Sequence, residues 1–245
     1  SILNWWFTCF GCTGFQTGRD WVSAFISLYE AKYGEKPPVS AWNIDLYPID
    51  WRGWQERSAG RDPGELLPND DWELMKGQIT GGTWDLLALG GPSQRYFVAS
   101  TPVTYEGMRT YLDGQGYQDT PIWITEMAVH WGYDDIVATL PPGPAGNYRW
   151  DDLSVFLNNI IDWLEADAES LGIEKWFLFT FWRNIAQPSE DAYAGLILSG
   201  ANDNTQRPQA GVAQLNCLGE VYRARSLDLA KVKCDSGGNT VPADP

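Results

Sequence analysis

Short apolar segments that alternate with helical segments constrain the fold of this chain more than any other feature. Four of them have the length and the apolar or aromatic content of strands: Leu3–Phe10, Val39–Tyr47, Pro121–Met127 and Lys175–Trp182. Strands that lack a clear polar face are typical of parallel sheets, which helices cover on both sides. The alternation therefore predicts an α/β fold built around a parallel sheet.

The helices between these strands are predicted from apolar spacing and from capping residues. Asp20–Tyr33 has apolar residues at helical spacing, and Gly34 follows as a stop. Asp151 and Asp152 are expected to cap a helix over Leu153–Leu171. Further helices are expected over Asp70–Ile79, Tyr105–Leu112 and Gln209–Leu229, with a short extended piece over Ala194–Leu198.

The remaining segments predict long loops and a single domain. Residues 49–68 and 131–147 follow the second and third expected strands and are rich in residues that favour loops. Residues 81–100 have no pattern that assigns them to a helix or a strand. We expect one domain over residues 1–234 and a flexible Gly- and Pro-rich tail over residues 235–245.

Composition excludes some classes of partner. The net charge of −15 argues against a nucleic acid or an anionic membrane as partner. No apolar run reaches the roughly 18 residues of a membrane span. The acidity fits either a neutral substrate outside the cell or simply a solvated surface. The 14 Trp residues fit either the stacking of sugar rings or a large core.

The four cysteines favour an oxidising compartment. Cys9 and Cys12 have zinc-ligand spacing, but Cys217 and Cys234 do not, and the only histidine is His130. We therefore favour disulfides in a secreted protein over a zinc site or free thiols. Cys217 and Cys234 are the favoured pair because both lie in or just after the last expected helix.

Glu126 is the candidate catalytic residue that the chain indicates most clearly. It lies at the carboxyl end of an apolar strand and before a loop that opens with His130, Trp131 and Tyr133. Burying an ionisable group there is unfavourable unless the group is paired or functional. A catalytic carboxylate, a structural ion pair and a residue at the rim all remain open on these grounds.

Three motifs in order resemble those of the retaining clan A glycoside hydrolases, which are (β/α)₈ barrels. Pro121–Glu126 (PIWITE) is similar to their strand-seven motif, and Asn43–Pro48 (NIDLYP) is similar to their strand-six motif. Lys175–Trp182 looks like strand eight, and Gly195-Leu196 resembles the stretch that closes the barrel. The resemblance covers about residues 39–224 and implies the C-terminal half of a barrel, strands five to eight.

The resemblance assigns roles to several residues. It implies that Glu126 is the nucleophile that attacks the anomeric carbon, with Tyr47 nearby and Trp182 under the reacting sugar. The proposed substrate-binding residues, some of them from loop position alone, are Tyr47, Asp45, Trp182, Trp131, Tyr133, Trp51 and His130.

Two departures from the family pattern bear on the chemistry. Asp45 stands where the clan often has His, so it is a candidate for binding a sugar hydroxyl or the surroundings of Tyr47. The clan's acid/base is a Glu preceded by Asn at the end of strand four, and the chain contains no Asn-Glu pair. Carboxylates in the loops (Glu56, Glu65, Asp134 and Asp135) are expected to be solvated charges. We therefore expect the acid in the N-terminal half of the same barrel, with this chain as one piece of it.

The expected function is retaining hydrolysis of a neutral β-linked polysaccharide, with a β-glucan as one candidate. No cofactor or metal is expected. The main alternative is a non-catalytic carbohydrate-binding protein that keeps the cleft and lacks the acid. A structural or zinc-stabilised interaction domain is a third reading.

Overall fold

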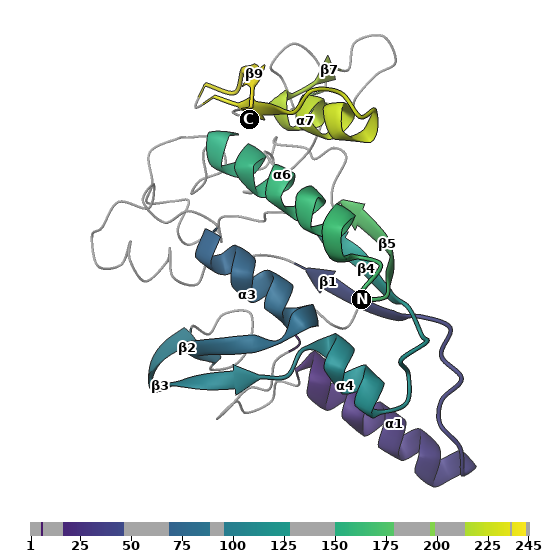
Figure 1. The fold of residues 1–245 in the computed structure, drawn as a ribbon. Helices are drawn as coiled ribbons and strands as arrows, with labels where there is room; N and C mark the ends of the chain where they lie inside the picture. Colours follow the sequence, from purple (N-terminus) through teal and green to yellow (C-terminus); the bar gives the residue numbers. More distant parts are fainter. Residues whose placement is uncertain are drawn as a thin grey trace. The chain divides into compact units, whose positions relative to one another are not determined.

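The structure is a computed structural model that describes residues 6, 17–46, 69–88, 96–127, 150–178, 197–198, 214–235 and 237–243 (Figure 1). The described helices are α1 (Gly18–Tyr33), α3 (Asn69–Thr80), α4 (Met108–Gly114), α6 (Trp150–Asp167) and α7 (Cys217–Ser226). The described strands are β1 (Trp42–Leu46), β2 (Gly82–Ala88), β3 (Tyr96–Tyr105), β4 (Ile122–Met127), β5 (Ile173–Leu178), β6 (Ile197–Leu198), β7 (Gln214–Leu215), β8 (Val232–Cys234) and β9 (Thr240–Pro242).

The chain divides into two compact units. The first unit comprises Ser1–Tyr47, Glu73–Met127 and Asp167–Phe177, and the second comprises Pro48–Trp72, Ala128–Ala166 and Leu178–Pro245. This division differs from the single domain expected over residues 1–234. The main sheet and the candidate site belong to the first unit.

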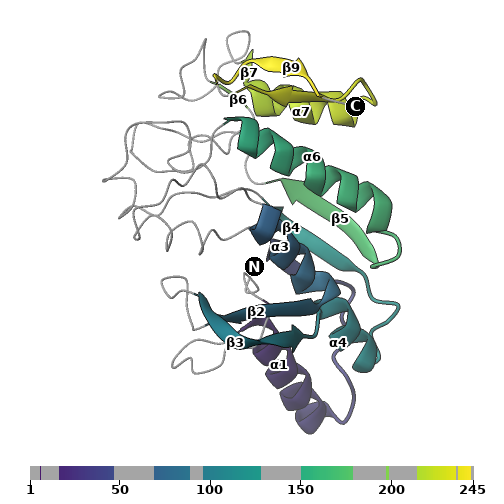
Figure 2. The ribbon, with the colours of Figure 1, turned by 60° about the vertical axis from the view of Figure 1, so that its left-hand side comes forward.

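The first unit contains a three-stranded sheet in the order β1-β4-β5 (Figure 1), and Figure 2 shows β4 and β5 side by side. β1 and β4 pair in parallel, and each lies within a segment that its apolar content predicted to be a strand. Ile44, Ile122 and Ile124 are completely buried. Burial of these aliphatic side chains supplies a large share of the stability of the sheet, since a buried Ile is worth about 1.5–3 kcal/mol.

Helix α1 confirms the helix predicted over Asp20–Tyr33 and begins two residues earlier. Thr17 caps its first turn, because the Thr17 side chain accepts a hydrogen bond from the backbone N–H of Asp20. Gly34 ends the helix in the left-handed conformation, with φ of 73°. The side chains of Val22 and Ile26 are buried. Phe25 on the same helix packs edge-on against Trp42 of β1, with the ring centroids 6.2 Å apart. This distance lies within the range of about 4.5–7 Å that aromatic pairs usually adopt.

An antiparallel hairpin occupies the segment that had no assignable pattern. β2 and β3 pair from Gly82↔Tyr105 to Ala88↔Tyr96. The prediction of a helix over Tyr105–Leu112 is therefore wrong at its start, because Tyr105 is the last residue of β3. The helix, α4, begins at Met108. Pairing across the hairpin holds Tyr105 in an extended conformation, and periodicity along the chain does not reveal such a partner.

Two other helices also differ from their predicted bounds. α6 begins at Trp150, so Asp151 and Asp152 lie in its first turn and do not precede it as caps. It ends at Asp167, and Gly172, with φ of 65°, follows in the turn before β5. α3 extends the helix expected over Asp70–Ile79 by one residue at each end.

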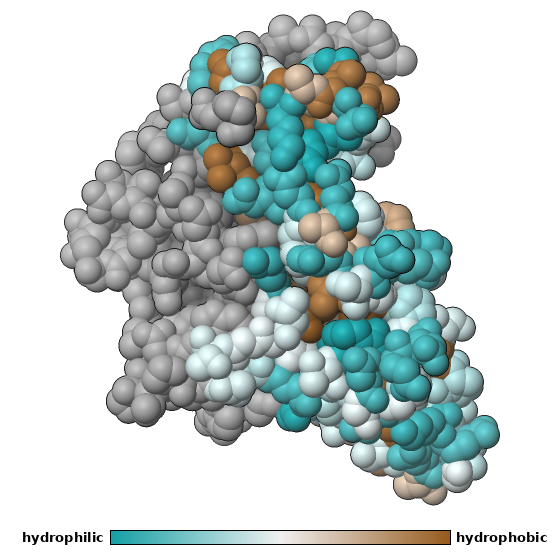
Figure 3. All heavy atoms as spheres, viewed as in Figure 1, coloured by the Kyte–Doolittle hydropathy of each residue, from teal (hydrophilic) through white to brown (hydrophobic). Residues whose placement is uncertain are grey.

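Helix α6 is amphipathic along its length. Phe156, Leu157, Ile160, Ile161 and Leu164 are buried at the spacing of one helical face. Hydrophilic residues gather on the face of α6 that Figure 3 presents to the viewer. The pattern is that of a helix with one side against a core.

The second unit ends in a short helix and a hairpin. α7 is shorter than the helix predicted over Gln209–Leu229, because Gln214–Leu215 pairs with Ile197–Leu198 as β7 with β6. Asn216 caps α7 by accepting a hydrogen bond from the N–H of Gly219. β8 and β9 form an antiparallel hairpin that places Thr240–Pro242 in a strand. The flexibility expected of the Gly- and Pro-rich residues 235–245 stays a prediction.

A disulfide joins Cys217, the first residue of α7, to Cys234, the last residue of β8. This is the pair that the sequence favoured. Cys9 and Cys12 lie outside the described residues. Arg225 of α7 forms ion pairs with Asp162 and Glu165 of α6. The disulfide therefore joins α7 to β8, and these ion pairs join α7 to α6.

Candidate functional site

The carboxyl ends of β1 and β4 bring Asp45 and Glu126 level with each other. The two strands are parallel neighbours, and their register pairs Asp45 with Glu126. Neighbouring strands lie about 4.7–4.9 Å apart. Two acidic residues that are 81 positions apart in the chain (126 − 45) therefore share one strand end.

A β-bulge produces this alignment. The pairing runs from Ile44↔Ile124 directly to Asp45↔Glu126, so Thr125 is an extra residue on β4. Without the bulge, Asp45 would lie opposite Thr125 and Glu126 would lie one position farther along. Bulges are frequent next to active sites, where they redirect a side chain.

Thr125 links the two strands through its hydroxyl group. Asn43 Nδ2 donates a hydrogen bond to Thr125 Oγ1 at 3.2 Å. Thr125 Oγ1 donates to Asp45 Oδ1 at 2.7 Å, and Ile44 O lies farther from it at 3.4 Å. These contacts tie the side chains of Asn43, Thr125 and Asp45 together on one side of the sheet.

The surroundings of the two carboxylates differ. Asp45 is 3% exposed, so its carboxyl group depends on partners within the protein. Glu126 is half-buried. Asn43, Thr125 and Trp123 are also half-buried, whereas the alternate positions hold completely buried isoleucines. One face of the sheet is therefore polar at this end, unlike the apolar faces usual in a parallel sheet.

Trp123, two positions before Thr125 on β4, makes a different set of polar contacts, with residues of β5. Trp123 Nε1 donates to Glu174 Oε2 at 2.8 Å, and Lys175 Nζ lies 4.3 Å from the centroid of the Trp123 ring. The cation–π contact and the hydrogen bond hold the ring of Trp123 against β5. This arrangement stabilises the pairing of β4 with β5.

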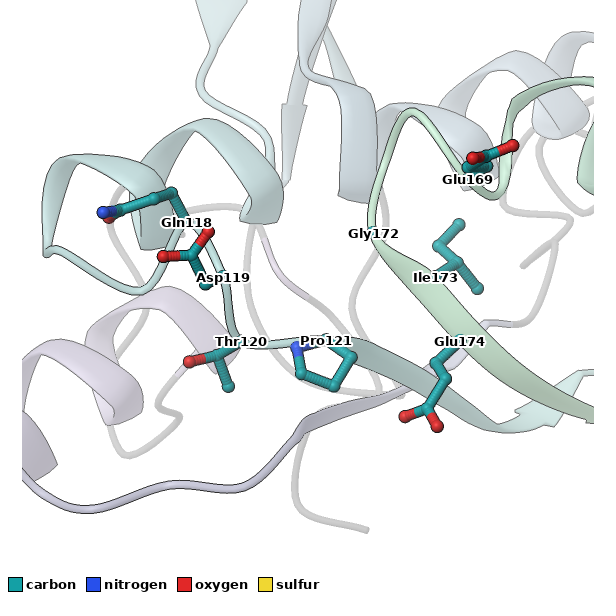
Figure 4. Close-up of a pocket in the computed structure, with 8 residues that line it drawn as sticks. All are labelled: Gln118, Asp119, Thr120, Pro121, Glu169, Gly172, Ile173 and Glu174. Carbon is teal, nitrogen blue, oxygen red and sulfur yellow. The ribbon is translucent and has the colours of Figure 1, made fainter.

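A cavity of about 210 Å³ lies where β4 and β5 begin (Figure 4). Its lining residues are Gln118, Asp119, Thr120, Pro121, Glu169, Gly172, Ile173 and Glu174. The cavity lies at the amino ends of the strands, whereas Glu126 lies near the carboxyl end of β4. In parallel α/β enzymes ligands bind at the carboxyl ends. We therefore take the strand ends at Asp45 and Glu126, not this cavity, as the candidate site.

Among the residues singled out in the sequence, the structure brings together Glu126 and Asp45. The other candidates lie outside the described residues: Tyr47, Trp51, His130, Trp131, Tyr133 and Trp182. Sequence reasoning missed the linking roles of Asn43 and Thr125. Asn43 could have been noted from its spacing of two from Asp45, which puts both on one face of a strand. No local signal marks the bulge at Thr125.

The described residues hold neither a group of three His, Cys, Asp or Glu side chains suited to a metal ion nor a helix long and apolar enough to cross a bilayer. Comparisons of the chain with protein-family models, with curated proteins and with solved structures gave no match.

Proposed function

We propose that this protein hydrolyses a neutral β-linked polysaccharide with retention of configuration and that Glu126 is the nucleophile. The observation that carries the proposal is the position of Glu126 near the carboxyl end of β4, level with Asp45 across a bulge. Enzymes built on parallel α/β barrels keep their catalytic groups at this end of the strands. The motif Pro121–Glu126, which resembles strand seven of clan A glycoside hydrolases, supports the same assignment.

The order of the sheet also supports a barrel half. β1, β4 and β5 are neighbours in the order in which they occur along the chain, with β1 and β4 parallel. Strands six, seven and eight of a (β/α)₈ barrel are neighbours in this way. We propose that β1, β4 and β5 correspond to these three strands.

In the proposed reaction, a carboxylate oxygen of Glu126 attacks the anomeric carbon and the glycosidic bond breaks. A second carboxyl group gives its proton to the leaving oxygen. A water molecule then attacks the glycosyl ester, gives its proton to that same second group and releases Glu126. The two carboxyl groups of retaining enzymes lie about 5–5.5 Å apart.

The second carboxyl group is proposed to come from another part of the barrel. The family resemblance places it on a Glu that follows Asn, and no Asn-Glu pair occurs in the 245 residues. The proposed partner is therefore the N-terminal half of the same barrel. The substrate is proposed to be polysaccharide outside the cell, because the acidic, Trp-rich composition and the cysteines favour a secreted protein.

Covalent trapping tests the nucleophile without the acid. A 2,4-dinitrophenyl 2-deoxy-2-fluoro-β-glycoside has a leaving group that departs without protonation, and its fluorine slows hydrolysis of the ester. Incubation of the full-length protein with the gluco-configured reagent should leave a glycosyl ester on Glu126, read by mass spectrometry of the peptide that contains it. Glu126→Gln should not be labelled, because the amide is not a nucleophile.

Glu174→Gln is the matched control, since Glu174 lies at the other end of the sheet and should leave labelling unchanged. Glu126→Gln should also lower turnover of a soluble β-glucan by several orders of magnitude while oligosaccharide binding remains. Label on another carboxylate, or near-normal turnover by Glu126→Gln, would refute the assignment. Binding of the glycan without labelling or turnover would instead favour the non-catalytic carbohydrate-binding alternative.

A further inference from the structure

The hydroxyl group of Thr125 occupies an unusual place at the end of the sheet. Thr125 is the extra residue of the bulge that aligns Glu126 with Asp45. Its hydroxyl accepts from Asn43 Nδ2 and donates to Asp45 Oδ1 at 2.7 Å. One side chain therefore joins the irregularity of β4 to the buried carboxyl group of β1.

The hydrogen bonds have a consistent direction. The amide N–H of Asn43 points at Thr125 Oγ1, and the single hydroxyl proton of Thr125 points at Asp45 Oδ1. A hydrogen bond from a hydroxyl group to a carboxylate is roughly twice as strong as one to a neutral acceptor. Asp45 is 3% exposed, so a fixed donor of this kind limits the rotation of its carboxyl group.

We infer that Thr125 is a positioning residue that holds Asp45 as a hydrogen-bond acceptor for a sugar hydroxyl beside the carbon that Glu126 attacks. This inference rests on the proposed function. Asp45 then contributes to binding of the sugar, and Thr125 acts through Asp45 without contacting the substrate. The substrate class that fits is a neutral sugar, whose hydroxyl groups donate to carboxylates.

This role differs from that of a general acid. A general acid must donate a proton to the leaving oxygen, whereas Asp45 accepts a hydrogen bond from the hydroxyl group of Thr125. It also differs from a purely structural link, which would change the amount of folded protein and not the affinity of the folded site. The two distinctions set the readouts of the experiment.

The test compares Thr125→Val with Thr125→Ser in the full-length protein. Val keeps the shape of Thr and removes the hydroxyl, whereas Ser keeps the hydroxyl. Thr83→Val is the matched control, because it breaks a comparable cross-strand hydrogen bond, 2.9 Å to Thr104, in the separate β2–β3 hairpin. KM and kcat are measured on a soluble β-glucan and on a 2,4-dinitrophenyl β-glucoside, with folding followed by circular dichroism.

Thr125→Val should raise KM about 10-fold on both substrates with kcat nearly unchanged, which is the signature of lost ground-state binding. Thr125→Ser and Thr83→Val should retain the wild-type KM. If Thr125→Val folds poorly, Thr125→Ala serves as a second variant that removes the hydroxyl and needs no space for the extra methyl group.

Three results would overturn the inference. An unchanged KM for the folded Val and Ala variants would remove Thr125 from substrate binding. A loss of kcat alone would indicate a structural role. A loss confined to the glucan, whose leaving group needs protonation, would make Asp45 part of the acid. In each of these cases the proposed function stands as long as Glu126→Gln is inactive, whereas an active Glu126→Gln refutes that function itself.

Discussion

The disulfide between Cys217 and Cys234 is expected to be a large single contribution to the stability of the second unit. We consider a variant in which both residues are replaced by Ala. The bond joins the start of α7 to the end of β8. Both sulfur atoms belong to buried residues, with exposures of 4% and 2%.

The magnitude follows from the length of chain that the bond closes. The two cysteines are 17 positions apart. Closing a loop of this length in the unfolded chain is worth about 3 kcal/mol at 25 °C in the chain-entropy description. For a protein of this size, 1 kcal/mol shifts Tm by about 2–4 °C, so the variant should melt about 6–12 °C lower.

Other contacts should preserve the native geometry after the bond is lost. Cys234 N donates to Ser154 Oγ at 2.9 Å, and Asn158 Nδ2 donates to Val232 O at 3.0 Å. Both contacts hold β8 to α6. We therefore expect lower stability with an unchanged circular dichroism spectrum in the native state.

The assay is thermal and urea unfolding in a Cys9→Ser/Cys12→Ser background, with and without the replacement of Cys217 and Cys234 by Ala. This background leaves Cys217 and Cys234 as the only cysteines of the chain. The oxidised and reduced forms of this background have the same side chains, so the difference between their Tm values reports the effect of the disulfide alone. Peptide mapping without reductant should show the 217–234 linkage. Equal Tm values for the oxidised and reduced forms would refute the entropy argument. In the wild-type protein, alkylation of all four cysteines without reductant would remove the main support for a secreted protein.

Two further predictions concern packing and pH. Gly107→Ala should destabilise the first unit by about 3 kcal/mol, because the new Cβ would lie 2.2 Å from a backbone nitrogen, whereas Gly114→Ala, with nothing within 4 Å, should be nearly neutral in urea unfolding. Burial of Asp162 opposes its ionisation, but hydrogen bonds from Lys231 and Arg225 outweigh burial and lower its pKa below the ordinary Asp value. The ionised carboxylate therefore contributes its full stability when the pH is above the ordinary pKa of Asp. That stability is lost as the pH falls through the lowered pKa of Asp162. Unfolding free energies at about pH 6 and about pH 3 should differ less in Asp162→Asn than in the wild type, and an equal difference would contradict the assignment.

The sequence alone predicted the elements whose signals are local. The helix over Asp20–Tyr33 was predicted because its apolar spacing and Gly34 act within a few residues of the chain. The strand at Pro121–Met127 was predicted because a short apolar run between turn residues suits a buried strand. The position of Glu126 at the end of that strand followed from the same run.

Other elements could not be predicted, because their signals come from distant partners. Tyr105 has a side chain that suits either a helix or a strand, and its pairing with Gly82 across the hairpin decides for the strand. Gln214–Leu215 lies in a predicted helix but pairs with β6. Tertiary pairing overrides weak local preference in both cases.

The candidate site divides in the same way. The sequence determined which residues at the strand ends carry carboxyl groups, Asp45 and Glu126. An acidic residue at the end of an apolar run can be recognised from the sequence without a structure. Only the tertiary structure decided that these two residues lie level, because their alignment depends on an extra residue, Thr125, in the register between strands 80 positions apart. A register shift of one residue changes which side chains face each other without changing any local pattern.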